Sequence, residues 1–103
     1  MLEQFTIDTF APLEGQTFRL HVEGVPPVEM RLESVTEIPV PGWRPQEAAE
    51  HRTPFSLVFL CRSQYVLQQA IYRFEHEAIG PFEIFIVPIS RTAEGVSYEV
   101  VFS

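Results

Sequence analysis

The chain has 103 residues, a mass of 11.8 kDa and a formal net charge of −7 at pH 7. Its seven Lys and Arg residues are all arginines, and they are scattered along the sequence. Nucleic-acid backbones and anionic membranes recruit clustered positive charge. We therefore expect neither nucleic acid nor a membrane as a partner.

Hydrophobic residues make up 46% of the chain, which at this length is enough for one core. We expect residues 1–103 to form a single domain. Cys61 is the single cysteine, so an internal disulfide is impossible. The N-terminus lacks a secretory leader pattern, and no apolar run approaches the roughly 20 residues of a membrane span. These features predict a cytoplasmic protein.

The first third of the chain predicts a hairpin preceded by a segment that fits two structures. Residues 1–10 fit either a short edge strand or a helical turn that lays Phe5 and Phe10 on the core. Residues 16–23 and 28–35 alternate apolar and polar side chains, as half-buried strands do. The glycine and two prolines between them predict a turn.

Residues 36–54 differ from the rest because they contain four prolines and the single tryptophan. A short helix, if present, is expected within them at 46–51. Connections longer than about 12 to 15 residues without structure of their own are usually functional or mobile in a compact domain. This segment is therefore the first place to look for a site.

Residues 55–61 predict a strand with its aromatic side chains on one face. The next segment, 63–79, fits a helix by its period, yet 70–75 within it also fits a strand. Ser63 has no acidic residue three positions on that would complete a capping box. We favour the strand on that ground.

The run 82–89 is the longest apolar run and predicts a central strand. Its even-numbered side chains point to one face, and its odd-numbered side chains, including Phe85 and Val87, point to the other. Both faces are therefore expected to be at least partly covered, and Pro88 is expected to end the strand. The C-terminal run 96–102 is the expected hairpin partner.

Together these elements predict an all-β fold. The expected architecture is a small antiparallel β-barrel or sandwich of about six or seven strands in meandering order.

Four segments of the second half carry recognisable motifs. They are Arg52-Thr53-Pro54-Phe55-Ser56-Leu57, residues 67–76 with Tyr72-Arg73-Phe74-Glu75-His76 at their end, residues 79–88 with Phe85-Ile86-Val87-Pro88 at their end, and the closing Tyr98-Glu99-Val100-Val101-Phe102. Together they resemble a family of small bacterial domains of unknown function, although Ala70 stands where that family often has glycine. The resemblance implies a mostly β domain with a strand at 67–76 and no known catalytic residues. It also implies an accessory or assembly role beside proteins with phage-tail-collar-like domains.

The histidines, the cysteine and the serines do not form a recognisable catalytic or metal-binding pattern. His21, His51 and His76 lack the spacing of zinc motifs, so we expect no metal and no cofactor. Cys61 ends an apolar strand, where a buried thiol is the usual state. Ser56 could meet His76, but no nucleophile elbow surrounds it. We therefore expect no enzymatic activity.

Trp43 and Arg44 form the pair most suggestive of binding. Tryptophan and arginine dominate interface energetics, and the surrounding prolines limit the entropy lost on binding. The ordinary alternative is that Trp43 plugs an open end of the β structure. With Arg52, these two are the candidate interaction residues.

The sequence thus predicts a non-enzymatic interaction or assembly module that binds a protein partner or a copy of itself. The expected surface is the 37–54 loop or an exposed sheet edge. The alternative is a small-ligand-binding barrel with a cavity lined by aromatic residues, namely Phe18, Phe55, Phe59, Tyr72 and Phe82.

Overall fold

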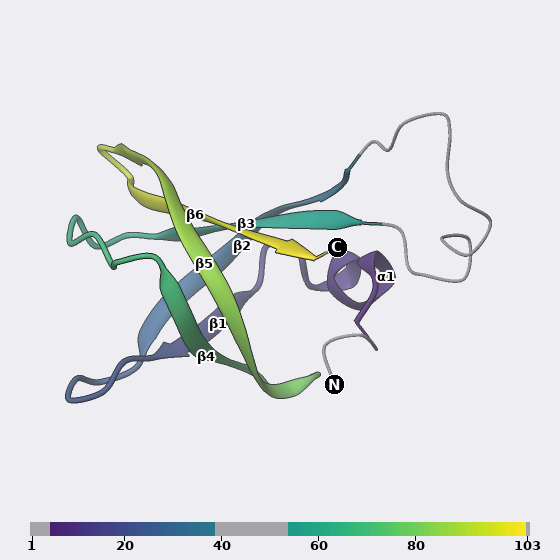
Figure 1. The fold of residues 1–103 in the computed structure, drawn as a ribbon, viewed down its shortest axis with the longest axis horizontal. Helices are drawn as coiled ribbons and strands as arrows, with labels where there is room; N and C mark the ends of the chain where they lie inside the picture. The colour runs from purple at the N-terminus through teal and green to yellow at the C-terminus, as the bar shows by residue number, and fades with distance from the viewer. Residues whose placement is uncertain (1–4, 39–53, 103) are drawn as a thin grey trace.

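The computed structural model describes residues 5–38 and 54–102, which contain a closed barrel of six antiparallel strands (Figure 1). The prediction of an all-β barrel is confirmed, and the segment that also fitted a helix holds a strand. The strands are β1 (Thr17–His21), β2 (Val28–Glu37), β3 (Phe55–Cys61), β4 (Ala70–His76), β5 (Gly80–Thr92) and β6 (Gly95–Phe102).

One end of the barrel is closed by an N-terminal helical segment made of α1 (Ile7–Phe10) and the 3-10 turn η2 (Ala11–Leu13) (Figure 1). The amide of Thr6 donates to Thr9 Oγ1 at 3.0 Å, which satisfies a backbone donor at the start of α1. Phe10 is fully buried, so the helical-turn alternative for the N-terminus is correct. The helix expected at 46–51 lies outside the described residues.

The strands follow the order β1-β2-β3-β6-β5-β4 around the barrel, so the predicted simple meander is wrong. The fold instead joins two three-stranded meanders, β1-β2-β3 and β4-β5-β6, through antiparallel pairs of β3 with β6 and β1 with β4. Within residues 5–38 and 54–102, each strand of the closed barrel pairs with two neighbours, so no whole strand forms the exposed sheet edge that the sequence suggested as a binding surface.

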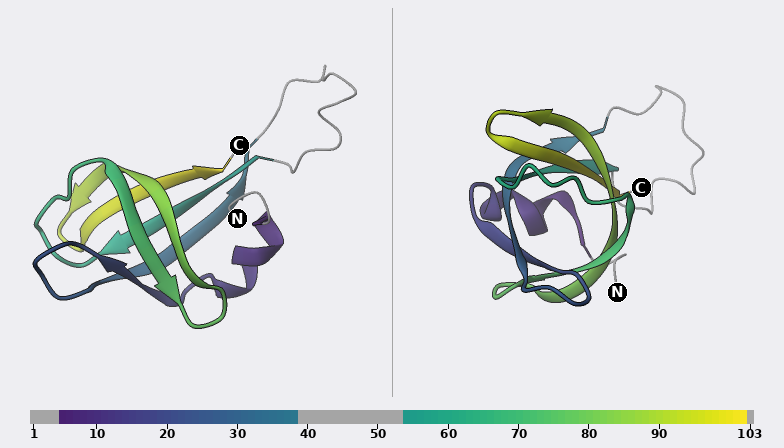
Figure 2. Two further views of the ribbon diagram at one scale, coloured as in Figure 1. Left: turned by 60° about the horizontal axis from the view of Figure 1, so that its bottom comes forward. Right: turned by 90° about the vertical axis from the view of Figure 1, so that its left-hand side faces the viewer.

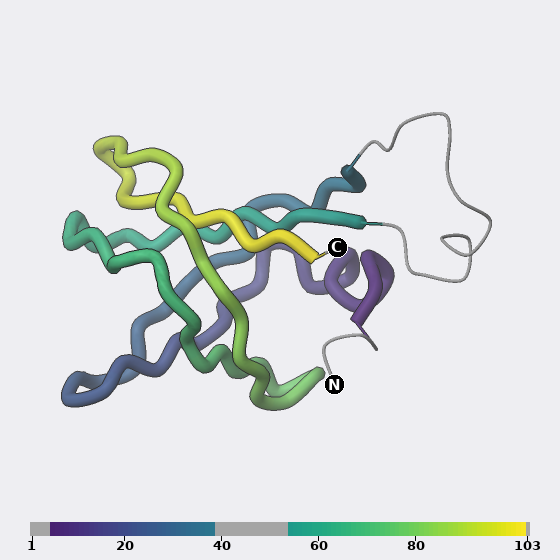
Figure 3. Tube along the Cα trace, in the orientation of Figure 1, coloured from purple at the N-terminus to yellow at the C-terminus, as the bar shows by residue number. Residues whose placement is uncertain are grey.

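Residues 62–69 connect β3 to β4 across the end of the barrel opposite α1 (Figures 2 and 3). Leu67 is half-buried there, and its amide donates to Tyr98 Oη at 2.9 Å. Burial raises the pKa of Tyr98 above its ordinary value of 10.0, and its phenol oxygen accepts this bond. The crossing segment is thereby tied to the inner face of β6.

Side chains of β5 alternate between the core and the outer surface from Pro81 to Val87. Ile84 and Ile86 are buried, whereas Glu83 and Phe85 are exposed. The expectation that both faces are at least partly covered is correct for the inner face and for the half-buried Val87, but wrong for Glu83 and Phe85. The strand also continues past Pro88, with a register shift directly after the proline, which has no amide hydrogen to donate.

The start of β6 requires glycine. Gly95 has φ of +142°, and a Cβ at this position would overlap the carbonyl oxygen of Cys61 and lie 2.8 Å from the Cα of Arg62. Without a side chain, Gly95 lets β6 approach the end of β3 closely.

Candidate functional site

The predicted interaction residues Trp43, Arg44 and Arg52 lie in 39–53, outside the described residues. The structure does show where this connection leaves the barrel. Ile38 donates its amide to the carbonyl of Pro54 at 2.9 Å, which extends the pairing of β2 with β3 by one step.

Exposed apolar side chains lie side by side on the outer surface of β4 and β5. Ile71 and Phe85 are 67% and 47% exposed, and Ile71 stands directly opposite Phe85. Val87, two residues further along β5 on the same face, is half-buried. We call Ile71, Phe85 and Val87 the outer apolar patch. Isolated exposed apolar residues are ordinary on a protein surface, whereas large contiguous groups are characteristic of interaction sites.

The outer surface of the other side of the barrel has a different character. There β1 and β2 present charged side chains, including Arg19, Glu29, Arg31 and Glu33. Arg31 Nε lies 2.8 Å from Glu33 Oε2. The outer surface of β1 and β2 is therefore charged, whereas that of β4 and β5 combines the outer apolar patch with charged residues.

Arg73, Glu83 and Glu99 border the outer apolar patch, and Glu99 of β6 stands opposite Val87. Arg73 of β4 stands opposite Glu83 of β5, one outward-facing position along from the pair formed by Ile71 and Phe85. Both side chains are exposed, and neither has an ion pair within 4.0 Å to another residue in the described ranges.

Sequence reasoning missed this patch although the sequence contained a signal for it. Phe85 and Val87 were correctly placed on the face opposite Ile84, but that face was expected to be covered within the domain. The structure covers the inner face, while Phe85 remains exposed and Val87 half-buried. A strand in a barrel wall has only one face toward the core. When its sequence is apolar on both faces, the outer face is a surface that another molecule can cover.

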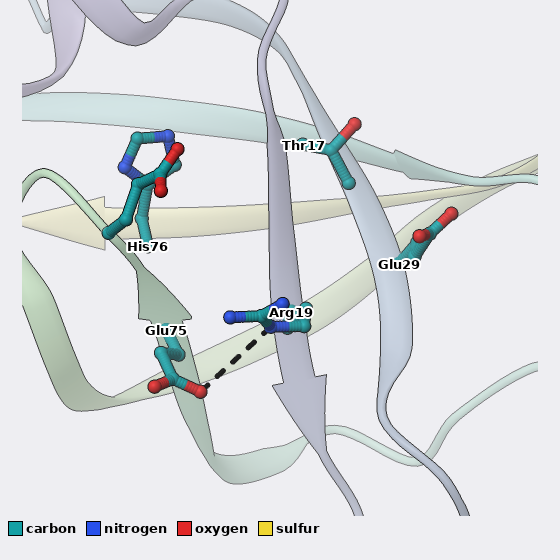
Figure 4. Close-up of a pocket in the computed structure, with 6 residues that line it drawn as sticks. Thr17, Arg19, Glu29, Glu75 and His76 are labelled. Atoms are coloured by element: carbon teal, nitrogen blue, oxygen red, sulfur yellow. Dashed lines mark ion pairs between the residues drawn. The ribbon is translucent and has the colours of Figure 1, made fainter.

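A polar pocket of about 250 Å³ lies where β1 meets β4, lined by Thr17, Arg19, Glu29, Glu75, His76 and Glu77 (Figure 4). Glu75 Oε1 lies 2.9 Å from His21 Nε2 and 4.0 Å from Arg19 Nε. The hydrogen bond from His21 is the main cause of a lowered pKa at Glu75, with the charge of Arg19 adding to it. These contacts join two strands that are distant in sequence.

His76 is buried and its two ring nitrogens are both engaged. Nδ1 accepts the amide hydrogen of Ala78 at 3.0 Å, so Nε2 carries the proton and donates to Gln16 Oε1 at 2.8 Å. The ring also packs against Phe18, with centroids 4.6 Å apart. His76 thus connects the β4–β5 turn to the start of β1.

The suggested meeting of Ser56 with His76 does not occur. Ser56 faces outward on β3, whereas His76 faces inward on β4, a strand that does not pair with β3. Cys61 is buried on the inner face of β3. Across residues 5–38 and 54–102, no group of three or more His, Cys, Asp or Glu side chains is arranged to hold a metal ion.

The interior of the barrel is packed with aromatic rings. Phe18 and Phe59 meet edge to face with centroids 5.2 Å apart, and Phe55 stacks on Phe102 at 4.6 Å. Phe82 is also buried among these rings, whereas Tyr72 is half-buried and donates its hydroxyl to the carbonyl of Gln68. Of the residues proposed to line a ligand cavity, Phe18 therefore packs against Phe59 and Phe82, and Phe55 packs against Phe10 and Phe102.

These features define a small six-stranded antiparallel β-barrel domain with a helical plug at one end and an apolar outer patch. The chain belongs to the family described as a domain of unknown function, DUF6916, whose model matches residues 5–102. No match to the chain is found among curated proteins or among solved structures. Within the described residues, the helices are too short to cross a membrane.

Proposed function

We propose that this domain is a non-enzymatic protein-interaction module that binds through the outer apolar patch. The observation that carries the proposal is the exposure of Ile71 and Phe85 directly opposite one another on the neighbouring strands β4 and β5. Rigid strands present these side chains in a fixed arrangement, so little conformational entropy is lost when a partner covers them.

The motif resemblance supports an accessory role for the module beside phage-tail-like or surface proteins, in the bacterial cytoplasm. Trp43, Arg44 and Arg52 remain predicted interaction residues of a second contact. The alternative of a small-ligand-binding barrel has less support, because aromatic rings pack directly against one another in the interior.

Site-specific photocrosslinking tests the proposal. A photoreactive phenylalanine analogue replaces Phe85 in the intact chain, expressed in its own host, and crosslinked species are identified by mass spectrometry. Val25 is the matched control position, because it is 53% exposed but lies in the β1–β2 turn, away from the patch. We expect a crosslinked protein from position 85 and none from position 25. Equal yields at the two positions, or none at 85, would overturn the proposal.

A further inference from the structure

We infer that the molecule covering the outer apolar patch is a second copy of this chain, an inference that rests on the proposed function. Two outward-facing pairs carry it. Ile71 stands opposite Phe85, and Arg73 stands opposite Glu83, all on the neighbouring strands β4 and β5. Each pair combines unlike side chains: an aliphatic group with an aromatic ring, and a cation with an anion.

This arrangement is complementary to itself. In a dimer with outer faces in contact, a twofold axis that runs between β4 and β5, parallel to the strands, places each strand over the other strand of the second copy. Ile71 then contacts Phe85 of the second copy, and Arg73 contacts Glu83 of the second copy. Each contact occurs twice, once in each direction.

The exposure of Arg73 and Glu83 in the single chain supports this interface. Arg73 and Glu83 are exposed and have no ion pair within 4.0 Å to another described residue. Two copies that each carry a net charge of −7 repel one another at long range. Two reciprocal Arg–Glu contacts beside an apolar centre offset that repulsion and fix the relative orientation of the copies.

Sedimentation equilibrium over a range of concentrations measures the dimer directly. We expect the wild-type chain to dimerise, and Phe85→Glu to weaken dimerisation by roughly tenfold or more because it puts a charge into the apolar centre. Val25→Glu is the control, with equal added charge in an exposed turn, and should dimerise as the wild type does. Dimerisation unaffected by Phe85→Glu would overturn the inference.

Charge reversal tests the twofold arrangement. Arg73→Glu alone places Glu against Glu in both contacts, and Glu83→Arg alone places Arg against Arg, so each variant should be monomeric where the wild type is dimeric. A one-to-one mixture of these two variants has an Arg–Glu pair in both contacts. We therefore expect the mixture to form a heterodimer, which also shows that both variants are folded.

Failure of the inference is distinguishable from failure of the proposed function. If the wild-type chain is monomeric at all concentrations while position 85 crosslinks to a different protein, the second copy is excluded and the interaction module stands. A mixture of the two charge variants that stays monomeric overturns the twofold arrangement.

Discussion

Glu75 is a residue whose ionisation is linked to folding. Its carboxylate lies at the junction of β1 and β4, within 2.9 Å of His21 Nε2. That hydrogen bond holds the pKa of Glu75 below its ordinary value of 4.5. The folded state therefore favours the ionised carboxylate more than the unfolded state does.

Acidification is expected to weaken the fold through this residue. A folded-state pKa below the unfolded value contributes stability that is present above about pH 4.5 and is lost as the pH falls through the lowered pKa. Urea midpoints measured between pH 6 and pH 3 should fall less steeply for Glu75→Gln and for His21→Gln than for the wild type. If the urea midpoints of the wild type and of both variants fell in parallel with pH, this assignment of the pH dependence to Glu75 would be contradicted.

At the scale of the element, β4 and β5 are neighbouring strands of the barrel, and each has one face toward the core and one toward solvent. The two strands offer a matched comparison, because Ile84 of β5 is 8% exposed and Ile71 of β4 is 67% exposed. The same substitution at these positions separates the contribution of the core from that of the outer surface.

Ile84→Ala should lower the free energy of unfolding by about 2 to 5 kcal/mol, since it removes buried methyl groups from a packed interior. Ile71→Ala, measured at concentrations where the chain is monomeric, should change it by less than about 0.5 kcal/mol. Urea denaturation checks both values. A larger loss for Ile71→Ala than for Ile84→Ala would reverse the assignment of inner and outer faces.

The strands themselves were largely predictable from the sequence, because alternation with a period of two reports directly on a wall with one buried face. Residues 55–61 coincide with β3, and the predicted C-terminal run 96–102 lies within β6. The residues on each face of β5 were also correct. What covers its outer face is not encoded in the alternation, and the outer apolar patch was missed for that reason.

The order of the strands could not be predicted in the same way. Pairing of β3 with β6 and of β1 with β4 depends on how two distant meanders dock, and no local turn signal fixes it. The N-terminal helical turn was left as one of two alternatives, because four helical residues carry too little periodicity to exclude a strand. Of the candidate site, Trp43, Arg44 and Arg52 fall outside the described residues.

At the scale of the whole molecule, Phe10 connects the helical plug to the barrel. Its ring centroid lies 5.4 Å from those of Phe5 and Phe102, and 6.0 Å from those of Phe55 and Phe82. The plug thus holds together rings from both meanders.

Phe10→Ala should lower the free energy of unfolding by about 3 to 5 kcal/mol, because it leaves a cavity among the surrounding rings. Asp8→Ala is the control on the exposed side of the same helical turn, and its effect should stay within about 0.5 kcal/mol. Thermal or urea melts of the two variants check the difference. Equal melting curves would show that the plug does not stabilise the barrel.

Residues 62–69 join two meanders that must pair with each other to close the barrel, and this requirement affects how the chain folds. Until the second meander forms, the first has an uncovered apolar face and two unpaired edge strands. The ladders that close the barrel join distant segments, as where Phe55 pairs with Phe102. Closing such large loops costs chain entropy before the contacts form. We therefore expect high contact order, slow folding on the millisecond-to-second scale and a single cooperative transition in which neither meander persists alone.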